Sequence, residues 1–274
     1  MSEAAAAPSF WNAAEQALAD RFLREGYLIE PVEDRDALDR IRQLLADRAA
    51  AALNLKQPDD HGHFLDRIGE VVDVARLNEF RLRVIGDLNA AAWARPAYFS
   101  IARRKIETIA GNELAMQRRL NLSIQLPGDD SSLLPVHADV WSGDSPFEIV
   151  LWTPLVNCYG TKAMYILPPE PAKRLERELH AFKGKSSEDI YRAFEKDVIF
   201  LEVPYGHCLL FNQNLPHGNR VNDETETRWS INCRFKGVFT PYADKKIGEF
   251  FEPITLRPAS RIGLAYELPG GFDG

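Results

Sequence analysis

The stretch Arg228-Trp229-Ser230-Ile231-Asn232-Cys233-Arg234-Phe235 alternates polar and mostly apolar residues without a break. Successive side chains of a β-strand point to opposite faces, so this period of two predicts a strand with one apolar and one polar face. The side expected to pack against helices holds Trp229, Ile231, Cys233 and Phe235, and the other side holds Arg228, Ser230, Asn232 and Arg234. A strand with one face in solvent would show the same alternation, so the surroundings of the two arginines stay open at this point.

Other short runs with strand character occur on the N-terminal side of this stretch. They are rich in β-branched and aromatic residues and are separated by Pro, Gly, Asp and Asn, which is typical of all-β structure. The runs are Leu120 to Leu126, Leu134 to Val140, Phe147 to Pro154, Ala163 to Leu167, Ile199 to Val203, His207 to Phe211 and Gly218 to Asn222. With the stretch from Arg228 to Phe235 they make eight strands, which predict a double-stranded β-helix, the jelly roll of cupin-like proteins.

The first third of the chain is expected to be mainly helical. Helical periodicity marks Phe10 to Glu25, Asp34 to Leu53, a stripe of Leu77, Phe80, Val84 and Leu88, and a segment from Pro96 through Tyr98 to Ala110. Gly26 ends the first helix and leads into the short strand Tyr27-Leu28-Ile29.

We therefore expect a mainly β fold with α additions, a jelly roll with helices packed on one sheet. A single domain is expected over residues 1–274: a mainly helical part (1–118), a jelly-roll core (119–236) and a C-terminal extension (237–274). A polar insert at 170–197 interrupts the core, and its charge run predicts helices with a solvated face.

Composition limits the classes of partner. The chain has 274 residues, 45% hydrophobic and 27% charged, and its net charge of −7 argues against duplex nucleic acid. The three cysteines show no CxxC pattern, which favours a reducing compartment. Met1 to Pro8 lacks the pattern of a signal peptide, and no membrane-spanning run is evident. We expect a cytoplasmic protein with a small-molecule substrate, no nucleic-acid or membrane partner, and an oligomeric state that the sequence leaves open.

The tripeptide His137-Ala138-Asp139 carries the candidate chemistry. On a strand, residues separated by one position point the same way, so His137 and Asp139 could hold one ion together. Such a tripeptide alone is weak evidence, because a satisfied pair in the core or on the surface is commoner. His217 supplies a third ligand, 78 residues after Asp139, and a jelly roll can bring distant strands together. Two histidines and one carboxylate leave three positions of an octahedral metal open, as in non-haem Fe(II) oxygenases.

These residues resemble the Fe(II)/2-oxoglutarate oxygenases, most closely the phytanoyl-CoA dioxygenase-like branch. The resemblance is carried by His137-x-Asp139, His217, Arg228 eleven positions later, and Ser230. It covers most of the chain and includes the opening stretch from Phe22 to Val32. The runs 121–127, 137–148 and 151–156, with the tail segments 250–254 and 261–264, are similar to a subgroup encoded in carbohydrate and aminoglycoside biosynthetic clusters.

The resemblance implies a role for each residue. Fe(II) would be held by His137, Asp139 and His217, and 2-oxoglutarate would chelate it, with O2 at the last position. The distal carboxylate of 2-oxoglutarate would meet Arg228, with a second hydrogen bond from Ser230. Related halogenating enzymes replace the carboxylate ligand by a small residue, and this chain keeps Asp139. Hydroxylation, or another oxidation such as desaturation or ring closure, is therefore expected rather than halogenation.

Further cavity residues are expected from alternation and from loops. Asn121, Ser123 and Gln125 alternate on one strand face and would contact 2-oxoglutarate or substrate, although a polar edge-strand face is an equal alternative. The residues expected to bind substrate are Trp141, Asp144, Glu148 and Arg234. Trp152 is expected in the core, and His61-Gly62-His63 in a solvated loop or lid rather than a second metal site.

Two other classes of function remain open. A metal-dependent sugar isomerase or epimerase on a cupin-type roll could use the same triad, but would have no evident need for a buried Arg228 and Ser230. A non-catalytic sugar-binding roll is the second alternative, and an intact triad counts against it. The function expected is oxidation of a small polar metabolite, a sugar or aminocyclitol, in a carbohydrate biosynthetic pathway.

Overall fold

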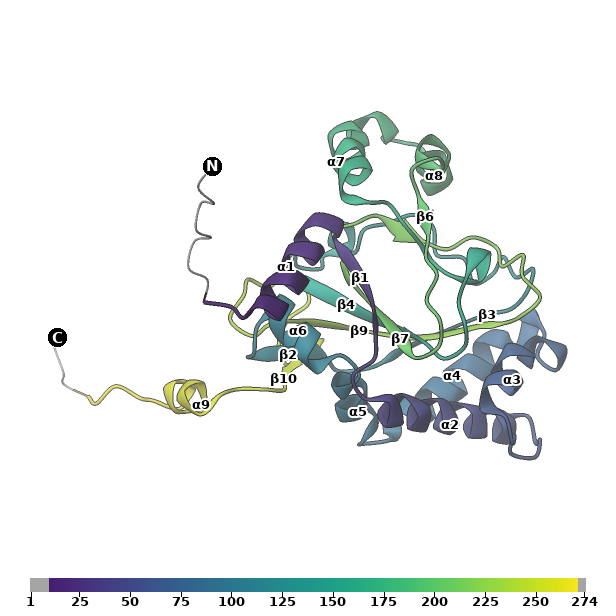
Figure 1. Cartoon of the computed structure of the whole chain (residues 1–274), viewed down its shortest axis with the longest axis horizontal. Coiled ribbons are helices and arrows are strands. Elements are labelled where there is room, and N and C mark those ends of the chain that lie inside the picture. The colour runs from purple at the N-terminus through teal and green to yellow at the C-terminus, as the bar shows by residue number, and fades with distance from the viewer. Residues whose placement is uncertain (1–9, 271–274) are drawn as a thin grey trace, which may run out of the picture.

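Two antiparallel sheets form the centre of the computed structural model, which describes residues 10–270 (Figure 1). The predictions made for Met1 to Pro8 lie outside these residues. The large sheet has the strand order β1-β7-β4-β9-β2-β10, and β3 also pairs with β9. Its strands are β1 (Tyr27–Pro31), β2 (Leu114–Gln117), β3 (Asn121–Gln125), β4 (Glu148–Pro154), β7 (His207–Asn212), β9 (Arg228–Gly237) and β10 (Phe251–Pro253). The small sheet has the order β6-β5-β8, with β5 (Tyr165–Ile166), β6 (Ile199–Phe200) and β8 (His217–Gly218).

Helices cover the outer face of the large sheet, as expected of the jelly roll, and helical residues outnumber strand residues. They are α1 (Ala13–Glu25), α2 (Arg35–Ala52), α3 (His61–Asp66) followed by the 3-10 turn η1 (Ile68–Glu70), α4 (Val74–Ala90), α5 (Ala94–Ser100) and α6 (Arg103–Ala110). In Figure 1, α2, α4 and α5 lie together on one side of this sheet. The fold class expected from the sequence is confirmed.

The apolar side of β9 packs against these helices, as its alternation predicts. Trp229, Ile231, Cys233 and Phe235 are all fully buried. The ring of Phe80, on α4, meets Trp229 edge-on with centroids 6.1 Å apart. The ring of Phe99, on α5, lies 5.9 Å from that of Phe235. The polar side of β9 must therefore face the small sheet.

Local signals fix how α1 joins the large sheet. The Asn12 side chain accepts hydrogen bonds from the first turn, and the Glu15 carboxylate accepts one from the Asn12 backbone N–H, which is a capping box. Gly26 ends the helix with φ of 73°, a left-handed conformation that favours glycine. A Cβ at this position would lie 2.6 Å from Cδ1 of Leu215, so a larger residue would also force that side chain to move.

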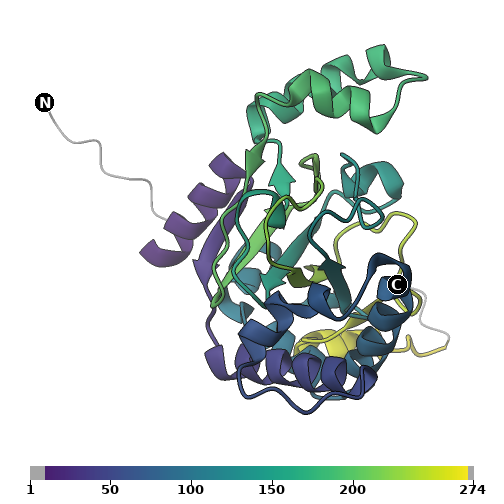
Figure 2. The same cartoon turned by 90° about the vertical axis from the view of Figure 1, so that its right-hand side faces the viewer.

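The polar insert forms α7 (Pro169–Glu178), the 3-10 turn η4 (Leu179–Phe182) and α8 (Ser187–Phe194). Figure 2 shows these helices projecting from the rest of the fold. Their inner side nevertheless packs on the small sheet: the ring of Tyr191 lies 5.1 Å from that of Tyr165. Glu188 forms an ion pair of 2.6 Å with Arg220, in the loop after β8.

Several predicted elements differ from the structure. Instead of a strand from Leu134 to Val140 there is one bridge at His137, because Pro135 has no N–H to donate and Asp139 opens the 3-10 turn η2 (Asp139–Ser142). The strand predicted from Gly218 to Asn222 is limited to β8, since Asn219 bonds the Leu134 backbone instead.

The helical segment expected from Pro96 to Ala110 is two helices, α5 and α6. The backbone breaks at Ala102 (φ −143°), and the Glu33 carboxylate accepts hydrogen bonds from the N–H groups of Arg104 and Lys105, which starts the second helix. The strands β2 and β10 were not predicted.

The C-terminal part adds β10 to the edge of the large sheet and then the helix α9 (Pro258–Leu264), which lies away from the body in Figure 1. Among residues 10–270, the structure holds no helix with the length and apolar character needed to cross a membrane.

Candidate functional site

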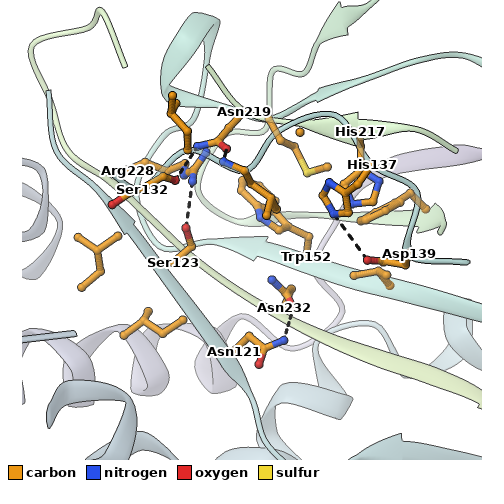
Figure 3. A pocket seen from close by; sticks show the side chains of 18 of the residues that line it. Asn121, Ser123, Ser132, His137, Asp139, Trp152, His217, Asn219, Arg228 and Asn232 are labelled. Atoms are coloured by element: carbon orange, nitrogen blue, oxygen red, sulfur yellow. Dashed lines mark hydrogen bonds and ion pairs between the residues drawn. The ribbon is translucent and has the colours of Figure 1, made fainter. Parts of the chain in front are cut away.

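A cavity of about 450 Å³ lies between the two sheets. Its walls include side chains of β3, β4, β7 and β9 from the large sheet and β8 from the small one. Figure 3 shows two groups of polar residues along it: His137, Asp139 and His217 at one end, and Ser123 and Arg228 at the other. We call these the metal end and the arginine end.

Backbone pairing places the two histidines side by side. The N–H of His137 donates to the carbonyl of His217 at 3.0 Å, and the N–H of His217 returns a bond of 2.8 Å. This pair extends the small sheet beyond β8 and sets the ring centroids 4.3 Å apart. Nδ1 of His137 lies 2.8 Å from the carbonyl of Pro135, and Nδ1 of His217 lies 2.9 Å from that of Leu215. If both Nδ1 atoms carry the proton, both Nε2 atoms are free to bind a metal.

Asp139, the first residue of η2, joins the histidines. Its backbone N–H donates to the carbonyl of Gln213 at 3.1 Å, and its Oδ1 lies 3.7 Å from Nε2 of His137. Nη2 of Arg234, from β9, donates to the same oxygen at 2.8 Å. Burial raises the pKa of Asp139, but its electrostatic interactions with His217 and with the guanidinium of Arg234 lower it by more, so the pKa lies below its ordinary value.

These three residues fit a divalent transition metal. Their ligand atoms all lie within 4.8 Å of one another, and no other group of three such ligands occurs in the part of the chain that the structure describes. Burial, with the nearby His137, lowers the pKa of His217 to about 4, so this ligand is the neutral imidazole that metals bind. Two imidazoles and one carboxylate are the donor set of non-haem Fe(II) sites.

The arginine end holds a buried cation without an acidic partner. Nη2 of Arg228 donates to Oγ of Ser123 at 2.9 Å, and its Nε has no hydrogen-bond partner. Ser230, the register partner of Ser123 across β3 and β9, also has an unpaired Oγ. Burial lowers the pKa of Arg228 to about 10, and no carboxylate of residues 10–270 forms an ion pair with it. A guanidinium in such a place calls for an anionic ligand.

Some predicted cofactor contacts reach the cavity and some do not. Asn121 and Asn232 line it, and the amide of Asn121 donates to Oδ1 of Asn232 at 2.9 Å. Gln125 is not part of the wall, because its amide donates to the carbonyl of Arg220 at 2.7 Å. The expectation that Gln125 contacts the cofactor therefore loses its geometric basis.

Three of the predicted substrate residues lie outside the cavity wall. Trp141 is partly exposed in η2, and Asp144 and Glu148 are buried beside it in a cluster of charges. Asp144 pairs with Lys245 and with Arg234, and the Glu148 carboxylate accepts a hydrogen bond from the N–H of Ser145 at 3.0 Å. Burial raises the pKa of Glu148 to about 7. Neither carboxylate is part of the cavity wall.

Arg234 does line the cavity, but it is bound to two carboxylates. Besides Asp139, its Nε lies 3.4 Å from Oδ1 of Asp144. Arg234 thus holds the metal-binding carboxylate in place, and the sequence prediction that it binds substrate is not supported by this geometry.

Sequence reasoning also missed part of the wall. Arg81 of α4, Ser132 and Asn219 line the cavity, and Trp152 is both core and wall. Ser132 and Asn219 lie in loops, and Arg81 lies in a helix far upstream in the sequence. No regular spacing of residues predicts that these side chains line the cavity. His61 and His63 lie in the short helix α3, not in a loop, and they do not join a metal-binding group.

Neither the known family models nor the curated proteins contain a match to this chain. Solved structures do match it in fold. The nickel complex of ThoJ, a non-haem monooxygenase, has a TM-score of 0.54 and 15% identity over 88% of this chain and 84% of its own. SnoK, a non-haem α-ketoglutarate-dependent carbocyclase of nogalamycin biosynthesis, has a TM-score of 0.52 and 13% identity over 88% of this chain and 96% of its own.

EctD from S. alaskensis with bound iron has a TM-score of 0.51 and 16% identity over 85% of this chain and 82% of its own. The chain shares its fold with these three enzymes. At these identities the likeness concerns the fold, so the activity must be argued from the site.

Proposed function

We propose that this protein is an Fe(II)- and 2-oxoglutarate-dependent oxygenase, and that it hydroxylates or otherwise oxidises a small polar metabolite. The observation that carries the proposal is the buried, acid-free Arg228 in the same cavity as a complete His-Asp-His group. A dicarboxylic keto acid suits such a cavity, since one end can bind a metal and the other a guanidinium.

The residues present have separate tasks. His137, Asp139 and His217 would hold Fe(II), which with 2-oxoglutarate and O2 supplies the oxidising chemistry when bound. Arg228 would hold the distal carboxylate of 2-oxoglutarate, and Ser123 and Ser230 lie where their hydroxyls can share that contact. Arg234 donates a hydrogen bond to Oδ1 of Asp139, the oxygen that lies 3.7 Å from Nε2 of His137, and so holds this carboxylate beside the histidines.

Other arginines are poor candidates for the same anchor. Arg220 is paired with Glu188, and Arg234 with Asp139 and Asp144. Among residues 10–270, the buried guanidinium left for the co-substrate is therefore that of Arg228. This argument also disfavours an isomerase or a sugar-binding roll, because neither needs a buried cation remote from the metal.

The substrate we propose is a sugar or aminocyclitol of a carbohydrate biosynthetic pathway. Amide and hydroxyl groups of Asn121, Asn219, Asn232 and Ser132 give the cavity wall a polar character suited to a polyhydroxylated ligand. The cavity volume of about 450 Å³ lies in the range of small-molecule sites.

We further propose one oxygenase domain in the cytoplasm. One continuous core runs from α2 through both sheets, which supports a single folding unit. All three cysteines are free and buried, which supports a reducing compartment.

The test is the coupled conversion of 2-oxoglutarate to succinate by purified protein with Fe(II) and O2. We expect wild-type protein to form succinate slowly without substrate and faster when a mixture of sugars and aminocyclitols contains the right one. The His217→Ala variant is the matched control. Succinate formation that is equal in wild type and His217→Ala, or absent in both with every substrate offered, would overturn the proposal.

A further inference from the structure

The cavity differs in charge from the rest of the molecule. The chain has 40 acidic and 33 basic residues. The cavity wall, by contrast, includes three arginines, Arg81, Arg228 and Arg234, and a single carboxylate, Asp139. A cavity with an excess of one charge raises the local concentration of ligands of the opposite charge.

Two of these arginines are accounted for. Arg234 is paired with Asp139 and Asp144, and the proposed function assigns Arg228 to 2-oxoglutarate. Bound Fe(II) and 2-oxoglutarate carry opposite charges of equal size, so loading the site leaves the excess unchanged. Arg81 remains without a counter-charge.

Arg81 comes from the helix that covers β3. Leu77, Phe80 and Val84 of α4 are buried against the sheet, and Arg81 lies between them in sequence, partly exposed, where the helix meets the cavity wall. Its Nη2 donates to Oδ1 of Asn78 at 2.9 Å, a neutral partner one turn earlier on the same helix. Within residues 10–270 no carboxylate forms an ion pair with Arg81, although exposed arginines of this chain commonly have one, such as Arg76 with Asp73.

Neither of the two acidic residues next to the cavity loop, Asp129 and Asp130, forms an ion pair with Arg81. Asp129 is buried and accepts hydrogen bonds from the N–H and Oγ of Ser131, at 2.8 and 2.6 Å. Both serine hydrogen bonds go to Oδ1 of Asp129, and this carboxylate neither forms an ion pair with Arg81 nor is part of the cavity wall. The guanidinium of Arg81 is left with free N–H groups in a cavity that already holds excess positive charge.

We infer that the substrate carries an anionic group, a phosphate or a carboxylate, which Arg81 binds at the cavity wall. The inference rests on the proposed function, because it takes Arg228 to be occupied by 2-oxoglutarate. Arginine suits both groups, since its planar fork makes paired hydrogen bonds to two oxygens. The substrate class then narrows to a sugar phosphate or a sugar acid, and an amino sugar without an acidic group is disfavoured.

The experiment compares sugars that differ in charge. Protein loaded with Ni(II), as a redox-silent metal, and saturated with 2-oxoglutarate is titrated by calorimetry with glucose 6-phosphate, glucuronate, glucose and glucosamine. We expect an anionic sugar to bind at least about tenfold more tightly than glucose, the effect of a single charge-assisted hydrogen bond. Tighter binding of glucose 6-phosphate or of glucuronate shows whether the anionic group of the substrate is a phosphate or a carboxylate.

Two variants on α4 distinguish binding of the anionic group at Arg81 from a general effect of the protein's positive charge. Arg81→Gln should abolish the preference for the anionic sugar, while Arg83→Gln, which removes an equal charge from an exposed position outside the cavity wall, should keep it. Equal binding of all four sugars, or an unchanged preference in Arg81→Gln, would overturn the inference. Wild-type protein that fails to bind 2-oxoglutarate before any sugar is added would instead refute the proposed function, so the two failures are distinguishable.

Discussion

Arg228 and Arg234 lie on the same face of the same strand, but they have different kinds of partner at the two ends of the cavity. Arg234, at the metal end, contacts two carboxylates, whereas Arg228, at the arginine end, contacts one serine hydroxyl. At the metal end, the positive charge of Arg234 is therefore paired with carboxylates of the protein. At the arginine end, the positive charge of Arg228 is neutralised only when an anionic ligand binds. This contrast suggests that Arg234 mainly holds a metal ligand in position, whereas Arg228 binds the anionic co-substrate.

The largest expected effect is at the metal end. His137→Ala, Asp139→Ala and His217→Ala each remove one of three ligands, and we expect each to reduce succinate formation to background because no other group of three ligands exists within residues 10–270. Metal content by elemental analysis should fall in parallel. His180→Ala, at an exposed position of the insert, is the matched control and should keep both the succinate formation and the metal content of wild type. Full turnover in any of the three ligand variants would show that the metal lies elsewhere.

The second effect tests whether Arg234 stabilises the fold. Arg234→Met leaves the buried carboxylates of Asp139 and Asp144 without their shared cation, and we expect a loss of about 3 to 5 kcal/mol in the free energy of unfolding. Urea unfolding of the metal-free protein measures it. The control is Arg192→Met, which breaks an exposed pair with Glu188 and should cost less than about 1 kcal/mol. Equal losses in the two variants would remove the contrast between the two ends.

The third effect has the opposite sign at the arginine end. Arg228→Met removes a buried charge that has no acidic partner, so the free energy of unfolding of the ligand-free protein should rise, on the order of 1 kcal/mol. The stabilisation that 2-oxoglutarate gives to wild type should be lost in the same variant. Thermal unfolding with and without 2-oxoglutarate measures both. A ligand-free Arg228→Met protein as unstable as Arg234→Met would contradict this view of the arginine end.

The last effect is a pH dependence. Burial lowers the pKa of His217 to about 4, below its ordinary value near 6.5, so the unfolded chain takes up a proton more readily than the folded one between these values. The free energy of unfolding of the metal-free protein should therefore fall as the pH is lowered from about 6.5 to about 4. His217→Gln should have a shallower slope over that range, and His180→Gln an unchanged one. Parallel slopes for wild type and His217→Gln would rule out this contribution.

The sequence predicted most where a regular period governs the side chains. The alternation of β9 gave the correct face for Trp229 and for Arg234, and the helical stripe of α4 gave its buried side. The triad was found from the spacing of His137 and Asp139 together with His217 and the resemblance to a known family. All of these signals are local or depend only on residue type.

The features that the sequence did not predict depend on tertiary contacts, which leave no periodic pattern in the local sequence. Asp139 converges with His137 from a loop and a 3-10 turn rather than along a strand. Asp144 and Glu148 were expected at the substrate, but Asp144 pairs with Arg234 and Lys245, and the Glu148 carboxylate accepts a hydrogen bond from the N–H of Ser145. Arg81 reaches the cavity because α4 packs on β3, which its own sequence surroundings do not reveal.

The central claim is that one keto acid joins the two ends of the cavity, and titration of metal-loaded protein with 2-oxoglutarate tests it most directly. Under anaerobic conditions with Fe(II), wild type should bind one equivalent, and removal of the metal should weaken that binding strongly. Arg228→Lys should weaken it by about 1.5 to 3 kcal/mol, because an ammonium group cannot reproduce the paired hydrogen bonds of a guanidinium. Affinity that is unchanged in Arg228→Lys, or that does not depend on the metal, would contradict the account.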